Sequence, residues 1–180
     1  MELIKTSLRN MLETNRKASY IFFIDIIYQI AKRMCYLHDM HIAHCDLKLD
    51  NILVNIEEKK VVNKFIEHAI VKVINFGISK IEVSSNPKTI ENNHIYGTNV
   101  FSFAMVYFKI LFKRDPFDDC RRDEILERIE RDERPKLPSN CDELTKLIKE
   151  CWNLNPLHRP KFAKNYERLI IASSTTNSIK

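Results

Sequence analysis

The chain has 180 residues, enough for about one domain with its own core. Hydrophobic residues make up 44% and charged residues 29%, which is typical of a globular protein and excludes a disordered one. The net charge of +5 comes without a basic stripe, so we expect no nucleic-acid partner. The most apolar runs, "IFFIDII" and "VFSFAMVYFKILF", are short and interrupted, so we expect no membrane span.

Glycine and cysteine usage narrows the class further. The only glycines are Gly77 and Gly97, so neither a P-loop nor a G-x-G-x-x-G phosphate loop can be built. The five cysteines show no paired spacing. Their odd number and the lack of a signal peptide predict free thiols in a reducing, cytoplasmic compartment.

The first half of the chain predicts helices and then a hairpin. A short helix is expected around "LIKTSLRNML", followed by an amphipathic helix from Tyr20 to Leu37. The stretch "HIAHCDLKLDNILV" (residues 41–54) reads as a loop that enters a strand at "NILV". "VKVI" (residues 71–74) is its expected partner strand, with "EEKK" as a solvated tip between them.

The second half predicts mostly helices. Residues 80–98 have no clear period and read as a loop, whereas Asn99–Phe112 is apolar enough for a helix buried on all sides. A charged helix follows, and "RPKLP" ends it. Its expected ion pairs, four residues apart, are Glu124–Arg128 and Glu127–Arg131.

The C-terminal part predicts two more helices. An amphipathic stripe is formed by four residues at helical spacing, namely Leu144, Leu147, Ile148 and Cys151. "KFAKNYERLII" predicts the last helix. We expect one domain over residues 1–172, mainly α within the α+β family and with one small β-hairpin, and a flexible tail over residues 173–180.

Four motifs in chain order resemble the C-terminal lobe of protein kinases. "YLHDMHIAHCDLKLDNILV" resembles the catalytic loop H-R-D-L-K-x-x-N, and "VKVINFGISK" resembles the strand with D-F-G. "NVFSFAMVYFKILFKRDPF" resembles the central D-V-Y-S-F-G helix, and "LIKECWNLNPLHRPKF" resembles the ending of tyrosine-kinase-like serine/threonine kinases. The resemblance implies ATP and Mg²⁺ as cofactors and a serine or threonine hydroxyl on a protein as substrate.

The resemblance implies a role for three loop residues. Asp46 matches the carboxylate that accepts the hydrogen bond of the substrate hydroxyl, and Lys48 matches the cation near the transferred phosphate. Asn51 matches the amide whose oxygen binds metal. A lysine two places after the aspartate resembles the serine/threonine branch.

Several positions depart from the family pattern. Asn75 replaces the D-F-G aspartate, so the implied nucleotide and metal site formed with Asn51 loses the negative charge that Mg²⁺ prefers. Cys45 replaces the arginine that grips a phosphorylated activation loop. Only 20 residues separate Gly77 from Thr98, without A-P-E, so Arg159 lacks its family glutamate and is expected to pair with another acid or to be solvated.

Two further departures affect the scaffold. Asn99 and Ala104 replace the aspartate and glycine of the central helix, which we interpret as a degraded brace for the catalytic loop. The resemblance begins near the first helix of the C-lobe, so we expect the N-lobe, with its glycine-rich loop and V-A-I-K lysine, to be absent. Without the N-lobe, one side of the ATP site is missing, so the positioning of the nucleotide on which phosphoryl transfer depends is lost.

Three functional hypotheses follow. The chain is a pseudokinase-like domain that acts by binding a protein partner; or an active serine/threonine kinase once an N-lobe is supplied; or a non-functional gene fragment. We favour the first and expect little phosphoryl transfer by this chain. A zinc site from Cys35, His38, His41, His44 and Cys45 is a weaker alternative, because the chain leaves the helix between them.

Overall fold

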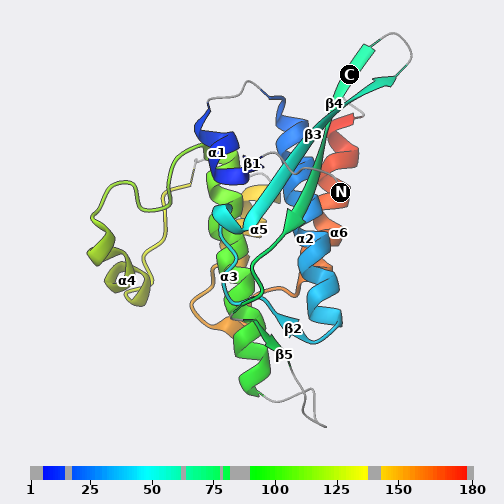
Figure 1. The fold of residues 1–180 in the computed structure, drawn as a ribbon. Coiled ribbons are helices and arrows are strands. Elements are labelled where there is room, and N and C mark those ends of the chain that lie inside the picture. The colour runs from blue at the N-terminus through cyan, green and yellow to red at the C-terminus, as the bar shows by residue number, and fades with distance from the viewer. Residues whose placement is uncertain are drawn as a thin grey trace.

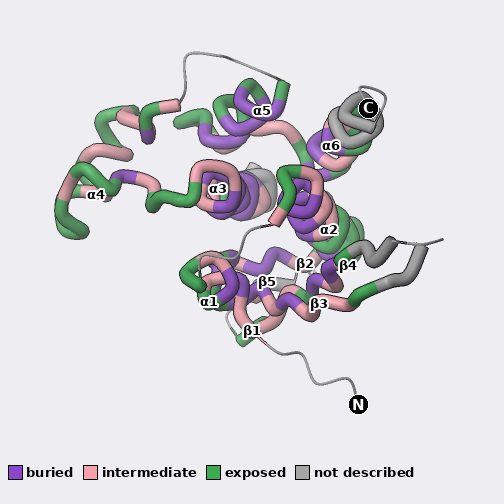
Figure 2. Tube along the Cα trace, turned by 90° about the horizontal axis from the view of Figure 1, so that it is seen from above, coloured by how far each residue is buried: buried purple, intermediate pink, exposed green. Residues whose placement is uncertain are grey.

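The computed structural model describes residues 6–14, 18–61, 64–77, 79–81, 90–137 and 143–177. In chain order the elements are β1 (Thr6–Ser7), α1 (Leu8–Glu13), α2 (Tyr20–Asp39), β2 (Ile42–Ala43), η1 (Leu49–Asn51), β3 (Ile52–Val61), β4 (Lys64–Val73), β5 (Lys80–Ile81), α3 (Ile90–Phe112), α4 (Arg122–Glu130), α5 (Glu143–Cys151), η2 (Pro156–His158) and α6 (Phe162–Asn177). Figure 2 shows α2 and α3 in the middle, with α5 and α6 on one side and α1 with both sheets on the other; we call α2, α3, α5 and α6 the helical layer and α1 with both sheets the second layer.

The predicted mainly α fold class is confirmed, although the β structure is larger than one hairpin. β1 adds a third strand beside β3, in the order β1-β3-β4. β2 pairs with β5 in a separate two-stranded sheet, with Ile42 opposite Ile81. Two-residue strands carry too little sequence pattern to be predicted from alternation.

Helix α2 forms the centre of the core, as its periodicity predicts. Ser19 caps its N-terminus by accepting a hydrogen bond from the Phe22 N–H at 3.1 Å. The apolar face is buried, and Ile26, Ile30 and Met34 have no exposed surface. This face packs against α6 and β4, so one helix joins the two layers (Figure 1).

The hairpin of β3 and β4 is longer than predicted. The strands pair in antiparallel register from Ile52–Val73 to Val61–Lys64, so "EEKK" lies within β3 and its prediction as a tip is wrong. Val54 and Val71 face each other and are buried, whereas Glu58 and Glu67 are exposed. Backbone pairing continues past the core because it needs no apolar side chains, which a hydrophobicity pattern does not report.

A side chain of α2 fastens the outer edge of this hairpin. Gln29 donates from Nε2 to the Ala69 carbonyl at 2.6 Å, and its Oε1 accepts from the Val71 N–H at 3.1 Å. The amide thereby replaces a neighbouring strand at the edge of β4. The hairpin that leads to residue 75 is consequently fixed on the helical layer.

Helix α3 begins at Ile90, so the prediction of a loop throughout residues 80–98 is wrong. Residues 82–89 lie outside the described part of the chain. The part of α3 around Gly97 packs against η2. A Cβ added to Gly97 would lie 2.7 Å from the Pro156 Cβ, so only glycine permits this approach.

The later turns of α3 are helical as predicted but are not buried on all sides, since Phe101, Met105 and Leu111 are only partly buried. Phe103, Tyr107 and Phe108 have no exposed surface. By length and hydropathy alone, His94–Phe112 is long enough to cross a membrane, which the shorter apolar run did not suggest. Half of that stretch is buried inside the domain, and such burial is equally typical of a core helix.

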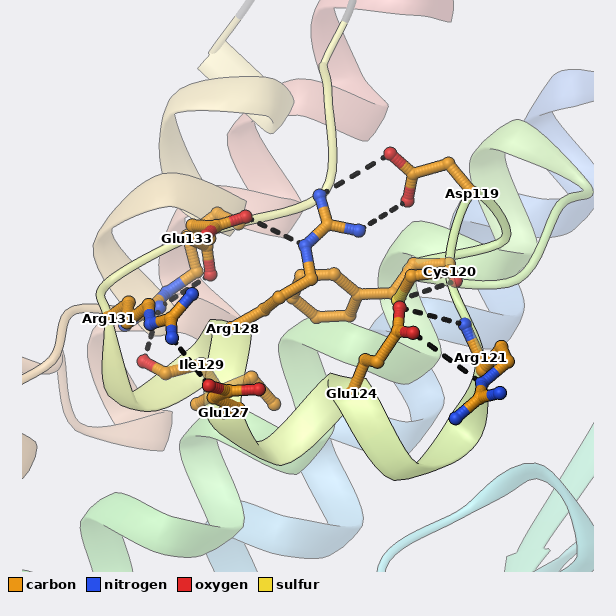
Figure 3. A network of polar contacts seen from close by, with 11 residues as sticks. Asp119, Cys120, Arg121, Glu124, Glu127, Arg128, Ile129, Arg131 and Glu133 are labelled. Carbon is orange, nitrogen blue, oxygen red and sulfur yellow. Dashed lines mark hydrogen bonds and ion pairs between the residues drawn. The ribbon is translucent and has the colours of Figure 1, made fainter.

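Helix α4 stands apart from the other helices and buries none of its residues (Figure 1). Charged contacts fix its ends to the flanking loops (Figure 3). Arg128 donates from Nε to Glu133 at 2.7 Å and from Nη1 to Asp119 at 2.9 Å. The guanidinium also lies over the Phe117 ring, 5.4 Å from its centroid.

The ion pairs predicted along α4 are half right. Glu127 and Arg131 do form their pair. The Glu124–Arg128 pair is wrong, since Glu124 instead lies 3.5 Å from Arg121. Arg128 is drawn to the two loop carboxylates because a planar guanidinium satisfies two acceptors at once.

Helices α5 and α6 complete the helical layer. The predicted stripe is confirmed, because Leu144, Leu147, Ile148 and Cys151 are all buried. α6 continues to Asn177, beyond the predicted end at Ile171. The boundary between a domain at 1–172 and a flexible tail at 173–180 stays a prediction, and residues 178–180 lie outside the described ranges.

Candidate functional site

His44 fixes the loop that runs from β2 to η1. Its ring has no exposed surface, and its Nδ1 accepts the Asp46 N–H at 3.2 Å. Since Nδ1 accepts, Nε2 carries the proton and donates it to the Ile74 carbonyl at 2.8 Å. The ring therefore ties the loop to the end of β4 and sets the direction in which Asp46 leaves the backbone.

Asp46, Lys48 and Asn51 converge as the sequence predicts. Asp46 Oδ2 lies 2.8 Å from Lys48 Nζ and accepts from Asn51 Nδ2 at 2.8 Å. Asn51 also donates to the Asp46 backbone carbonyl at 2.8 Å, which fixes both ends of the turn. The Lys48 hydrogen bond, supported by that of Asn51, lowers the pKa of Asp46, so its carboxylate is ionised.

Asn75 joins this group through a contact that sequence reasoning missed. Its Nδ2 donates to Asn51 Oδ1 at 2.9 Å. That oxygen is the atom to which the resemblance assigns a metal ion, so the amide of Asn75 occupies one of its acceptor positions. An aspartate could not donate this bond when ionised. The resemblance implies that the two amides share one site, but only the structure shows that one donates a hydrogen bond to the other.

The donor set does not fit a magnesium ion. Asn51 and Asn75 offer neutral amide oxygens, and the Asp46 carboxylate is already balanced by Lys48. Magnesium binds oxygen ligands that include carboxylates or phosphates and demands near-octahedral geometry. The chain of hydrogen bonds from Lys48 to Asn75 carries no net negative charge that would hold such a cation.

The brace behind the loop is retained, so its interpretation as degraded is wrong. Asn99 is only 1% exposed, and its Oδ1 accepts the Cys45 N–H at 2.9 Å. Its Nδ2 lies 3.1 Å from His38 Nε2, which accepts the bond. Burial lowers the pKa of His38 to about 4, so the ring is neutral and able to accept. Ala104 is fully buried in α3.

Cys45 stands at a backbone position that few residues favour. Its φ is 65°, in the left-handed region, and the Asn99 contact helps to hold it there. The thiol donates to the Ala43 carbonyl at 3.5 Å, within its own turn. The side chain that replaces the family arginine is thus used locally.

A long-range ion pair supports the loop from the opposite side. Arg9 of α1 makes two parallel hydrogen bonds to Asp50 of η1, at 2.7 and 2.9 Å. Bidentate pairs of this kind fix geometry as well as charge. The two residues lie 41 positions apart, and no local pattern signals their contact.

Arg159 follows neither of the two predicted outcomes. In the described part of the chain it pairs with no acid, and it is only half-buried. It donates to three backbone carbonyls, those of Asn153 at 2.7 Å, Gly97 at 2.8 Å and Leu154 at 3.2 Å. Carbonyl oxygens satisfy its donors without supplying a counter-charge.

The residues of the zinc alternative are used in other ways. His38 packs between rings of α3 and α6, His44 bonds the end of β4, and Cys35 donates to Asp39 at 3.7 Å. Among the described residues no three His, Cys, Asp or Glu side chains are grouped to hold a metal ion. The four described cysteines, Cys35, Cys45, Cys120 and Cys151, are free thiols, and Cys141 lies outside the described ranges.

The fold and the loop agree with the family comparison. Residues 1–168 match the family model of the protein kinase domain. The matched segment contains the features expected from the resemblance, namely a helical lobe, a hairpin and the hydrogen-bonded arrangement of His44, Asp46 and Asn51. The chain belongs to the protein kinase domain family.

Curated relatives are serine/threonine kinases by name or protein kinases more broadly. The chain is 34% identical to the "Light-sensor Protein kinase" of Ceratodon purpureus, over 84% of this chain and 14% of that protein. It is 30% identical to "RGS domain-containing serine/threonine-protein kinase A" of Dictyostelium discoideum, over 83% and 14%. It is 28% identical to "Serine/threonine-protein kinase STY17" of Arabidopsis thaliana, over 81% and 26%. The chain thus spans only about a seventh to a quarter of these relatives' own length.

Proposed function

We propose that this chain is a pseudokinase-like domain of the tyrosine-kinase-like serine/threonine group, which acts by binding a protein partner in the cytoplasm. The observation that carries the proposal is the hydrogen bond from Asn75 Nδ2 to Asn51 Oδ1. It occupies one acceptor position of the oxygen that a metal would need, at a site without net negative charge. The family relationship supports a protein as the partner.

The retained loop supports structural use of its residues. Asp46 is held by Lys48, by Asn51 and through its backbone by His44, so its carboxylate completes a turn. Phosphoryl transfer depends almost entirely on positioning and on charge around the phosphates. Among the residues that the structure describes, the loop positions one carboxylate but provides no anionic anchor for the metal that would carry the phosphates.

The test is nucleotide binding and turnover by the purified chain. We expect no magnesium-dependent thermal shift with ATP and no phosphate release above that of the Asp46→Asn variant. Asp46→Asn is the matched control, because a contaminating kinase would give the same rate with either protein. Turnover that disappears in Asp46→Asn would overturn the proposal.

The retained geometry also favours a second candidate, a serine/threonine kinase that works when a further segment supplies the nucleotide-covering lobe. Asp46, Lys48 and Asn51 already lie within hydrogen-bonding or ion-pair distance. The discriminating protein is a fusion to a kinase N-lobe, made with Asn75 and with Asn75→Asp. Turnover by both fusions favours this candidate, whereas turnover by neither, or only by Asn75→Asp, favours the binding function.

A further inference from the structure

A pocket of about 490 Å³ lies at the end of the molecule where α2 ends and α3 begins. The loop at η2 and the first turn of α6 close its other sides. Its volume is within the range that small-molecule sites usually have. Asp46, Lys48, Asn51 and Asn75 do not line it. The lining includes Cys35, His38, Tyr96, Val100, Leu157 and Phe162.

Arg159 gives this pocket a positive charge that the described residues leave without a counter-ion. Three of its N–H groups are used on carbonyls, which leaves two of the five for another acceptor. Burial, and then the nearby charge of Arg134, lowers the pKa of Arg159 to about 10. A half-buried guanidinium without a counter-ion is stabilised by an anion that binds against it.

The other charges of the lining favour an anion with a single charge. Lys161 and Asp39 are both exposed at the pocket and offset each other, so Arg159 remains as the net charge. The first turn of α6 adds to the positive side, because it contains no acidic residue and presents the N-terminal end of a 16-residue helix.

The interior of the pocket is aromatic. The ring of His38 lies 4.5 Å from that of Tyr96 and 4.9 Å from that of Phe162, the latter edge to face. Since His38 is neutral, its imidazole is an uncharged flat ring beside those of Tyr96 and Phe162, and the three rings form one wall of the pocket. Flat apolar groups pack well on such a wall by stacking or by edge-to-face contact.

We propose that this pocket binds a small aromatic monocarboxylate, with the carboxylate on Arg159 and the ring against His38 and Tyr96, which Phe162 supports from the core. The inference does not depend on whether the chain transfers phosphate, because Asp46, Lys48, Asn51 and Asn75 do not line the pocket. The guanidinium and the carboxylate match in geometry as well as in charge.

Cys35 provides a local readout, because its thiol lines the pocket and is partly exposed. The probe is 2-naphthoate, and its neutral partner of equal shape is 2-naphthamide. Alkylation by iodoacetamide is followed at each cysteine by peptide mass spectrometry. We expect saturating 2-naphthoate to slow Cys35 alkylation by about tenfold, and 2-naphthamide to need about tenfold higher concentration. Cys120, outside the pocket, should be unaffected by either.

Two variants on neighbouring positions of α6 locate the site. Ala163 lines the pocket and is exposed, so Ala163→Trp fills the space without burying the new ring in the core. Lys164 is exposed and does not line it, so Lys164→Trp is the matched control. Protection of Cys35 by 2-naphthoate should be lost in Ala163→Trp and kept in Lys164→Trp.

Any of three results would overturn the proposal. The first is that 2-naphthoate does not slow the alkylation of Cys35 at any concentration up to its solubility. The second is that 2-naphthamide protects Cys35 as well as 2-naphthoate does. The third is that 2-naphthoate still protects Cys35 fully in a folded Ala163→Trp variant. If Ala163→Trp does not fold, the comparison of the acid with the amide on the unchanged chain still decides the outcome.

Discussion

Two asparagines, Asn99 and Asn75, stand where the resemblance expects aspartate, and the structure uses them differently. At Asn99 the family role is to accept a hydrogen bond, and the amide oxygen still accepts the Cys45 N–H. At Asn75 the role is to supply negative charge, and the amide supplies a donor to Asn51 in its place. An amide therefore replaces a carboxylate as an acceptor but not as an anion.

The largest effect is expected from removing the buried amide at position 99. Asn99→Leu leaves the Cys45 N–H and His38 Nε2 without partners in a site that is 1% exposed. Two such losses should lower the free energy of unfolding by about 3 kcal/mol. Asn99→Asp keeps the acceptor and should cost less, as denaturant titration at pH 7 will show. If the two variants lowered the free energy of unfolding equally, the role of Asn99 as a hydrogen-bond acceptor would be wrong.

The second effect is a dependence of stability on pH through His38. Its pKa is about 4 in the folded chain against 6.5 in the unfolded chain, because burial disfavours the charged ring. The unfolded chain thus binds more protons between these values, so stability is complete above pH 6.5 and falls as the pH drops towards 4. The full loss is about 3 kcal/mol, spread over that window.

Protonated His38 would also face the Nδ2 donor of Asn99, and turning the amide would break the Cys45 contact. Denaturant midpoints measured between pH 7 and pH 5 should show the slope. His38→Gln is the control, since its carbonyl accepts from Asn99 but does not titrate. An unchanged slope in His38→Gln would assign the effect to other groups.

The third prediction separates two effects of Asn75, the hydrogen bond that it donates to Asn51 and the negative charge that it does not supply. Asn75→Ala frees Asn51 Oδ1 but adds no charge, whereas Asn75→Asp frees it and restores the anion. If charge is decisive, magnesium affinity measured by titration calorimetry should rise by about tenfold or more in Asn75→Asp. It should change by less than about twofold in Asn75→Ala. An equal gain in both variants would show that the hydrogen bond alone excludes the ion.

The sequence predicted what local patterns and motifs report. Periodicity identified α2 and the stripe of α5, and the loop motif predicted that Asp46, Lys48 and Asn51 would meet. The start of α3 was missed because its residues show no apolar period, and no periodicity signals the close contact of Gly97 with Pro156. The contacts of Asn75 and Asn99 were missed because the sign of an amide's contribution depends on which neighbour its two ends face.

The smallest effect is expected at the ion pair between Arg9 of α1 and Asp50 of η1. Both side chains are more than a third exposed, so solvent screens the pair, and Arg9→Ala should cost about 1 kcal/mol or less. A double-mutant cycle with Asp50→Asn isolates the contribution of the pair.

The same pair should make stability depend on pH. The hydrogen bond from Arg9 lowers the pKa of Asp50 below its usual 3.8. The pair's contribution is therefore present above that value and is lost as pH falls through the folded pKa. A coupling energy that persists unchanged in strong acid would mean that packing of α1 on η1, and not the ion pair, supports the loop.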